Sequence, residues 1–205
     1  MGFSDRPPMP ENVISLKREL DLPSRSDDEL MLLASGGSRE AFETLVRRHA
    51  RAVLGFCARS VGEPARGEEI AQEIWLSVWD HRRDFRAEGR FVPWLFTLAR
   101  NRVRNAHRDA ARRPVVPLDP EVVEARADRS PSELDRLIEV ERRARVEQAL
   151  VNVSPVLREA LLLRFGQDLP YTTVAEALDT SESTARSRVF HGLKELRRVL
   201  RGAST

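Results

Sequence analysis

The sequence predicts an all-α protein made of two small helical domains that a flexible linker joins, the second a helix-turn-helix. Three observations lead to this prediction. Apolar residues recur at spacings of three and four over most of the chain, and no segment alternates as a strand would. Capping residues and glycines divide the pattern into helix-sized pieces. A stretch with four prolines, residues 113–131, separates two helical parts and predicts the linker.

The first domain is expected over residues 24–112, after a mobile leader at residues 1–23 that carries four prolines and little periodicity. Ser26 and Glu29 have the spacing of a capping box, which marks a helix start. Four helices should follow, at 27–34, after Ser38, at about 68–81 and at about 91–112. The glycines at 62 and 67 should break the pattern before the third.

The second domain is expected over residues 132–205. Helical spacing covers 132–152, and Ser154 followed by Pro155 predicts a new helix start, because proline suits the first turn. The last two helices are expected at 171–178 and 182–200, with a turn between them.

Composition excludes several classes of protein. The chain has 205 residues, 41% of them hydrophobic, and no apolar run long enough to span a membrane. The N-terminus lacks the apolar core of a secretory signal, so we expect a cytoplasmic protein. Cys57 is the single cysteine and should be a buried apolar residue. The four histidines are scattered, so we expect no metal site. We also expect no cofactor and no small-molecule substrate.

Charge is distributed unevenly, although the formal net charge is only +2. Residues 81–113 hold ten Arg and three acids, a net of +7, and residues 182–201 have a net of +4. Residues 61–80 and 119–147 are acidic. Two basic segments separated by an acidic one, residues 119–147, indicate two contacts with a polyanion such as DNA.

The segment 169–200 has the pattern of a helix-turn-helix. Ala185, Val189, Leu193 and Leu196 would form the inner stripe of its second helix. The opposite face offers side chains that suit base edges and phosphates: Thr184, Arg186, Ser187, Arg188, His191 and Lys194. An ordinary pair of packed helices is the alternative interpretation.

The stretch GRFVPWLFTLARNRVRN, residues 89–105, joins aromatic residues to an Arg/Asn tail on one expected helix. Aromatic rings next to arginines suit unpaired bases, which stack on rings while arginines hold the backbone. The alternative is that Phe91 and Trp94 are core residues. We find no nucleophile paired with a base, and we expect no enzymatic activity and no catalytic residue.

Three segments resemble the sigma-70 family of bacterial RNA polymerase sigma factors, in the extracytoplasmic-function group. EEIAQEIWLSVW at 68–79 is similar to region 2.2, FRAEGRFVPWLFTLARNRVRNAHRDAARR at 85–113 to regions 2.3 and 2.4, and TARSRVFHGLKELRR at 184–198 to region 4.2. The resemblance covers about residues 24–200. It implies a factor that binds core RNA polymerase, reads the −35 and −10 promoter elements and nucleates DNA melting.

The resemblance also implies roles for individual residues. Binding to core polymerase falls to Glu69, Gln72, Glu73, Leu76 and Trp79. The −10 element falls to Arg86, Arg90, Phe91, Trp94, Arg100, Asn101, Arg104, Asn105 and Arg108. The −35 element falls to the six residues of the 184–194 face named above. An anti-sigma protein is a further partner that the family suggests.

The sequence departs from the family at two positions of the last helix. Ser183 stands where glycine is frequent, and His191 where arginine is frequent. The alternative function is a helix-turn-helix regulator that does not bind polymerase. We also expect the free protein to be compact, with the acidic linker near the basic faces.

Overall fold

A computed structural model describes residues 22–110 and 133–202, and every regular element in these two ranges is helical. We call the first range the N-terminal half and the second the C-terminal half. The N-terminal half contains η1 (Leu22–Ser24), α2 (Asp27–Ser35), α3 (Arg39–Val61), α4 (Pro64–Asp80), η2 (Arg82–Asp84) and α5 (Phe91–Ala110). The C-terminal half contains α6 (Glu133–Val151), α7 (Pro155–Leu161), the π-type turn η3 (Leu162–Gly166), α8 (Tyr171–Ala177) and α9 (Glu182–Gly202). The predicted all-α class is confirmed.

The predicted helix caps at the start of the chain are present. The Ser26 hydroxyl accepts a hydrogen bond from the Glu29 amide at 3.3 Å, and the Glu29 carboxylate accepts one from the Ser26 amide at 2.9 Å. Ser38 caps α3 by accepting from the Ala41 amide at 3.2 Å. These side chains satisfy amides that the first turn of a helix leaves without partners.

The helix α4 starts earlier than the sequence indicated. It begins at Pro64, so Gly67 lies inside the helix and does not break it. A Cβ atom on Gly67 would come within 2.5 Å of the Ala58 Cα on α3. The glycine therefore permits close packing of α3 against α4, a reason for glycine that a one-dimensional pattern does not reveal.

The N-terminal half begins slightly before the boundary expected at residue 24. Leu22, inside the predicted leader, is buried in the core next to α3, where η1 packs. The rest of the leader and the predicted linker at 113–131 lie outside the described residues.

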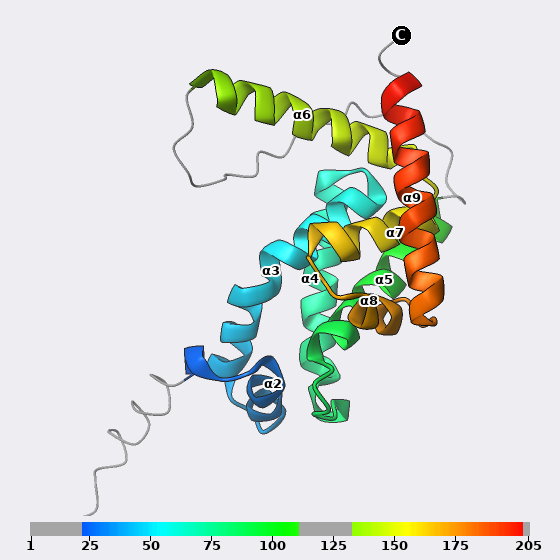
Figure 1. Ribbon diagram of the computed structural model, residues 1–205. Coiled ribbons are helices and arrows are strands. Elements are labelled where there is room, and N and C mark those ends of the chain that lie inside the picture. Colours follow the sequence, from blue (N-terminus) through cyan, green and yellow to red (C-terminus); the bar gives the residue numbers. More distant parts are fainter. Residues whose placement is uncertain (1–21, 111–132, 203–205) are drawn as a thin grey trace, which may run out of the picture.

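The two halves are packed against each other (Figure 1). Helix α5 contacts α8, and α3 contacts α6, α7 and η3. One continuous cluster of buried apolar side chains runs through both halves, from Leu30 and Phe56 to Leu163 and Val189. The protein is thus closed, as expected for the free chain, and the closure decides which basic residues reach the surface.

Candidate nucleic-acid interface

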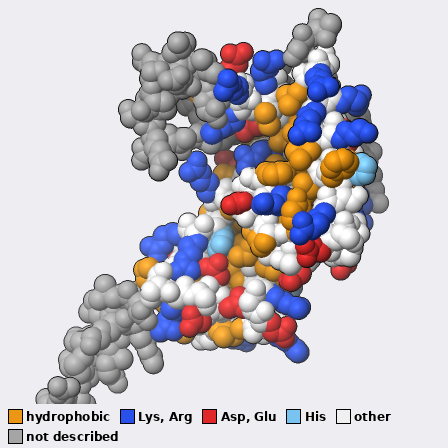
Figure 2. All heavy atoms as spheres, viewed as in Figure 1, with side chains coloured by type: hydrophobic (Ala, Val, Ile, Leu, Met, Phe, Trp, Pro, Cys, Tyr) orange, Lys and Arg blue, Asp and Glu red, His pale blue; other side chains and the backbone are white. Residues whose placement is uncertain are grey.

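Helix α9 presents its basic face outward. Ala185, Val189 and Gly192 are buried on its inner face, and a Cβ on Gly192 would come within 2.9 Å of the Leu161 side chain on α7. On the other face Arg186, Ser187, His191 and Lys194 are exposed, and Thr184 and Arg188 are partly exposed. Figure 2 shows Lys and Arg side chains gathered over this helix. The structure brings all six predicted −35 residues to one accessible helix.

Local contacts hold the start of α9 in place. Ser181 caps the helix by accepting from the Thr184 amide at 3.2 Å. The Arg186 guanidinium lies 4.4 Å from the Tyr171 ring centre and donates to the Glu182 carboxylate at 2.5 Å and 3.0 Å. A side chain that is already ordered loses less freedom when it binds a partner.

Helix α5 divides its basic residues between surface and interior. Phe96, Ala99 and Val103 are buried on the stripe that the sequence predicted. Towards the C-terminal end the predicted −10 residues Asn101, Arg104, Asn105 and Arg108 are exposed, and Arg108 donates to the side chain of Asn105. In the preceding loop Arg86 and Arg90 are exposed as well.

The structure contradicts the prediction that Phe91 stacks on a base. Its side chain is only 1% exposed and lies in an aromatic cluster with Phe85, at 6.0 Å, and Trp94, at 6.2 Å between ring centres. Phe91 is a core residue, because its position in the first turn of α5 faces α2 and α3. Trp94 is half-buried, so part of its ring remains available.

Arg100, predicted to hold a DNA phosphate, is also buried, with 8% exposure. It crosses to the C-terminal half. Its Nη1 donates to the Ala177 carbonyl at the end of α8 at 3.3 Å, and its Nε lies 3.3 Å from Glu159 Oε2 without good hydrogen-bond geometry. A cation at the C-terminus of a helix is favourable. In the closed protein Arg100 therefore joins the halves and does not face solvent.

Glu159 on α7 is a buried charged residue that the sequence did not single out. It is 4% exposed, and the positive charges of Arg100, Arg104 and Arg188 act on it. Burial raises the pKa of Glu159 despite these charges, and burial lowers the pKa of Arg100. Both directions mean that loss of hydration outweighs mutual attraction, as is common for buried ion pairs. A carboxylate thus stands where arginines predicted for both promoter elements converge.

A second contact between the halves centres on the Ser60 carbonyl at the end of α3. Arg158 on α7 donates to it at 2.6 Å and also to the carbonyls of Val151 and Val153 at 2.5 Å and 3.0 Å. His107 on α5 approaches the same oxygen at 3.2 Å. Burial lowers the pKa of His107, and the nearby Arg158 charge lowers it further, although the Ser60 carbonyl acts in the opposite direction. A protonated His107 would repel Arg158.

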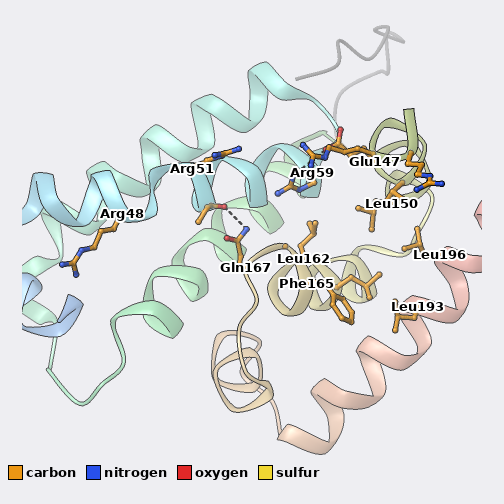
Figure 3. A pocket seen from close by; sticks show the side chains of 16 residues that line it. Arg48, Arg51, Arg59, Glu147, Leu150, Leu162, Phe165, Gln167, Leu193 and Leu196 are labelled. Carbon is orange, nitrogen blue, oxygen red and sulfur yellow. Dashed lines mark hydrogen bonds and ion pairs between the residues drawn. The ribbon is translucent and has the colours of Figure 1, made fainter. Parts of the chain in front are cut away.

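Two hollows lie between the halves. The smaller one, about 600 Å³, separates the loop around Arg86 and Arg90 from α8 and the turn after it, with Trp94 on its wall. The larger one, about 940 Å³, has arginines of α3 on one side and apolar residues of α6, η3 and α9 on the other (Figure 3). Gln167 closes part of it by donating to the Ala52 carbonyl at 3.2 Å.

The outer face of α4 carries the predicted polymerase-binding residues. Glu69, Gln72, Glu73 and Leu76 are exposed, and Leu76 is 66% exposed. Trp79 is half-buried against Phe42, with the Arg82 guanidinium 4.0 Å from its ring centre. Glu73 forms an ion pair with Arg102 at 3.7 Å, so this residue also links α4 to α5. In the described residues no helix is long and apolar enough to cross a membrane.

Sequence comparison identifies the family of the chain. The sequence profile of sigma-70 region 2 matches residues 45–113, and that of sigma-70 region 4 matches residues 143–196. The chain is 32% identical to RNA polymerase sigma factor CarQ of Myxococcus xanthus over 164 residues, which cover 80% of this chain and 91% of that protein. This protein belongs to the sigma-70 family, in the extracytoplasmic-function group. A sigma-H factor of Pseudomonas aeruginosa is 27% identical over 87% of this chain and 96% of its own.

Solved structures of sigma factors have the same fold. CnrH, in a complex with the cytosolic domain of CnrY, matches with a TM-score of 0.65 and 25% identity over 87% of this chain and 99% of its own. RpoE of Bartonella quintana, in a complex with the anti-sigma factor NepR, has a TM-score of 0.62 and 20% identity. It covers 78% of this chain and 96% of its own. The match to RpoE shows likeness of fold alone.

Proposed function

We propose that this sigma-70 family protein binds core RNA polymerase through α4, reads the −35 element with α9, and captures bases of the −10 element with α5 and the loop before it. It performs no chemistry, and it acts in the cytoplasm, where bacterial polymerase works. The single observation that carries this proposal is the exposed face of α4. Leu76 is 66% exposed, and Trp75 and Trp79 are only partly buried. Trp79 lies three positions after Leu76 and four after Trp75 on α4, so three large apolar side chains reach one face.

Opening of the closed protein is part of this function. The names of the −35 and −10 elements place them about 25 base pairs apart, and at about 3.4 Å per base pair this is roughly 85 Å along B-form DNA. Arg100 on α5 lies 3.3 Å from the Ala177 carbonyl on α8, so the helices proposed for the two elements are neighbours. Both elements can be bound at once only after the halves separate. Tethering to polymerase then raises the effective concentration of each half at its own site.

Separation also releases basic side chains. Arg100 would lose its contacts with Glu159 and Ala177 and become able to reach a phosphate, as Arg104 and Arg108 already are. Phe91 stays in the core of the N-terminal half, because its aromatic neighbours all belong to that half. Of the two aromatic residues in the first turn of α5, only Trp94 is therefore proposed to stack on a base.

An anti-sigma protein is the further partner that we propose. The solved structure of CnrH contains the cytosolic domain of CnrY, and that of RpoE contains the anti-sigma factor NepR. The groove of about 940 Å³ between the halves suits an amphipathic helix with one acidic face. Arg48, Arg51 and Arg59 would face its acids, and Leu162 and Leu196 its apolar side (Figure 3). Such a partner would hold the halves together and oppose the opening that promoter binding requires.

Co-elution with core polymerase tests the proposal. The variant Gln72→Ala/Leu76→Ala removes two exposed side chains of α4 and avoids Glu73, which packs α4 against α5. Glu43→Ala, an exposed position on α3, is the matched control. We expect wild type and the control to co-elute with core polymerase and the α4 variant to be weakened at least about tenfold.

Run-off transcription from genomic fragments with the wild-type holoenzyme should then recover a promoter. Failure of the wild-type chain to bind core polymerase, with DNA binding intact, would instead support an ordinary helix-turn-helix regulator. Equal binding by the α4 variant would remove α4 from the interface and leave the family assignment in place.

A further inference from the structure

The carboxylate of Asp28 makes an unusual set of contacts with the loop before α5. It accepts hydrogen bonds from three successive backbone amides: Gly89 at 2.5 Å, Arg90 at 3.3 Å and Phe91 at 3.0 Å. Asp28 lies in the first turn of α2, more than 60 residues away in sequence. This contact therefore ties the N-terminus of α5 to a different helix.

Helix α5 needs such a partner from outside. The first amides of a helix have no acceptor within it, and a side chain just before the helix normally supplies one. That position here is Arg90, whose carbonyl accepts from the Trp94 amide in the first turn. An arginine side chain has no acceptor atom and cannot cap. Asp28 supplies both the acceptor and a negative charge, which the N-terminus of a helix favours.

Gly89 completes the arrangement from the side of the loop. Its φ is +71°, the left-handed region that other residues rarely adopt, although no atom lies within 4 Å of where a Cβ would be. Glycine is thus required by the conformation and not by lack of space. In this conformation the Gly89 amide reaches Asp28 at 2.5 Å.

The loop is consequently fixed at both ends. Phe85 is buried against Phe91 and Trp94, with ring centres 6.0 Å and 5.4 Å away, and the other end is held by Asp28. Arg86 and Arg90, both exposed, lie within this short span. Their positions relative to Trp94 depend on these two attachments. A loop that is already ordered spends less binding free energy on ordering when it captures a base.

We propose that Asp28 is a positioning residue for promoter opening, which holds the loop 85–91 and the start of α5 in the shape that captures −10 bases. This inference rests on the proposed function. Asp28 touches no DNA in this scheme and acts through Gly89, Arg90 and Phe91. Its effect should therefore fall on the melting step and not on polymerase binding.

Asp27 provides a matched control on the same helical turn. Its carboxylate contacts Arg48 at 2.7 Å and His49 at 2.7 Å on α3, and it takes no part in the hydrogen bonds that Asp28 accepts from residues 89–91. Substituting either acid removes one negative charge from the first turn of α2. Asp28→Ala alone removes hydrogen bonds to the loop, whereas Asp27→Ala reaches it only indirectly, through the His49 ring 5.5 Å from the Phe91 ring. A clearly larger effect of Asp28→Ala therefore reports on the loop.

The test compares holoenzymes carrying Asp28→Ala or Asp27→Ala on two templates of the recovered promoter. One template is fully paired, and the other has unpaired bases over the −10 element. We expect Asp28→Ala to reduce transcription at least about tenfold on the paired template, because it removes hydrogen bonds to a charged acceptor. The reduction should be within about twofold on the unpaired template, where the cost of separating base pairs is absent.

Two further variants exclude a general loss of folding. Asp28→Asn keeps one acceptor oxygen and should restore part of the activity on the paired template. Gly89→Ala strains the same turn from the other side and should show the same preference for the unpaired template. Asp27→Ala should affect both templates equally. Equal losses on both templates for Asp28→Ala would overturn the inference and give Asp28 a purely structural role.

Amide hydrogen exchange on the free protein separates this inference from the proposed function. Asp28→Ala should speed exchange at Gly89, Arg90 and Phe91 by about tenfold or more, and Asp27→Ala should leave these amides unchanged. Unchanged exchange in Asp28→Ala would contradict the inference even if the holoenzyme is active. A wild-type chain that transcribes from no promoter would overturn the proposed function, whatever the exchange shows.

Discussion

The two basic helices of this sigma factor differ in how the closed fold treats them. Helix α9 packs one face on α7 and α8 and leaves Arg186, Ser187 and Lys194 on the surface. Helix α5 instead has α8 against it, so Arg100 is buried and Trp94 borders a cleft between the halves. The surface proposed for the −35 element is accessible in the free chain, and the surface proposed for the −10 element is partly covered. If the proposal holds, opening of the protein matters more for the −10 element than for the −35 element.

The residues that cover the −10 surface are charged and buried, which makes the closure sensitive to small changes. Glu159 is surrounded by arginines, yet burial still raises its pKa. Buried pairs of this kind often contribute little net stability, although removal of one partner alone is strongly destabilising. The closure can thus be firm in the intact protein and still yield to a competing partner such as DNA.

The largest effect is expected for Arg158→Ala. The guanidinium satisfies the carbonyls of Ser60, Val151 and Val153, and the substitution leaves these oxygens without that donor. The free energy of unfolding should fall by about 3 kcal/mol or more in urea titrations. Arg197→Ala, at an exposed position of α9, should change it by less than about 0.5 kcal/mol. A loss below about 1 kcal/mol for Arg158→Ala would show that this contact does not hold the halves together.

A double substitution sharpens the comparison at the Arg100–Glu159 pair. Arg100→Ala leaves Glu159 buried without its nearest cation, which should weaken the closed form by about 3 kcal/mol. Arg100→Met/Glu159→Leu removes both charges and should restore closure. Small-angle scattering measures the radius of gyration of each variant. The radius should rise for Arg100→Ala and stay at the wild-type value for Arg100→Met/Glu159→Leu. Equal radii for wild type and Arg100→Ala would contradict the role of the pair.

DNA binding by the free protein should reveal the difference between the two helices directly. Arg186→Ala should weaken binding to a duplex with the −35 element by about 1–3 kcal/mol, because arginine is the commonest reader of guanine edges. Arg100→Ala should not weaken it, since Arg100 is buried in the closed chain. Fluorescence anisotropy with a labelled duplex measures both. A similar loss from both variants would mean that the free protein is open when it binds DNA.

The smallest effect is expected from pH. Burial and Arg158 lower the pKa of His107 in the closed form below the ordinary value of 6.5. The contribution of His107 to closure is therefore complete above pH 6.5 and is lost as pH falls through its lowered pKa. The contribution of Glu159 to closure has the opposite pH dependence, because its pKa is raised. Wild type and His107→Gln both contain Glu159, so it does not affect the difference between them. Scattering from pH 8 to pH 5 should show opening of wild type that His107→Gln reduces, and parallel curves would exclude His107.

Much of the fold could be predicted because its signals are local. The capping box at Ser26 and Glu29, the caps at Ser38 and the stripe of α9 all depend on residues within one helix. Gly67 differs, because the need for glycine there comes from α3, where the backbone of Ala58 approaches it closely. A helical period identifies a buried face, and it does not identify the surface that buries it.

Sequence alone determines less about which candidate site residues reach the surface, for the same physical reason. The outward face of α9 follows from its own sequence, and the six residues predicted for the −35 element lie at least partly exposed on it. Phe91 and Arg100 were assigned to DNA because a ring or a guanidinium at a helix surface suits DNA as well as it suits another helix. Asp28 and Glu159 were missed, since their partners are 61–63 and about 60 residues away in sequence.

The measurement that tests closure and opening most directly is energy transfer between dyes on the two halves. Cysteines introduced at Glu43 on α3 and Arg197 on α9 are exposed. Burial raises the pKa of the native Cys57 thiol to about 12, so the dyes should not react with it. We predict high transfer in the free protein and a fall when core polymerase and promoter DNA are added. The same transfer in both states would contradict the claim that the halves separate to read the two elements.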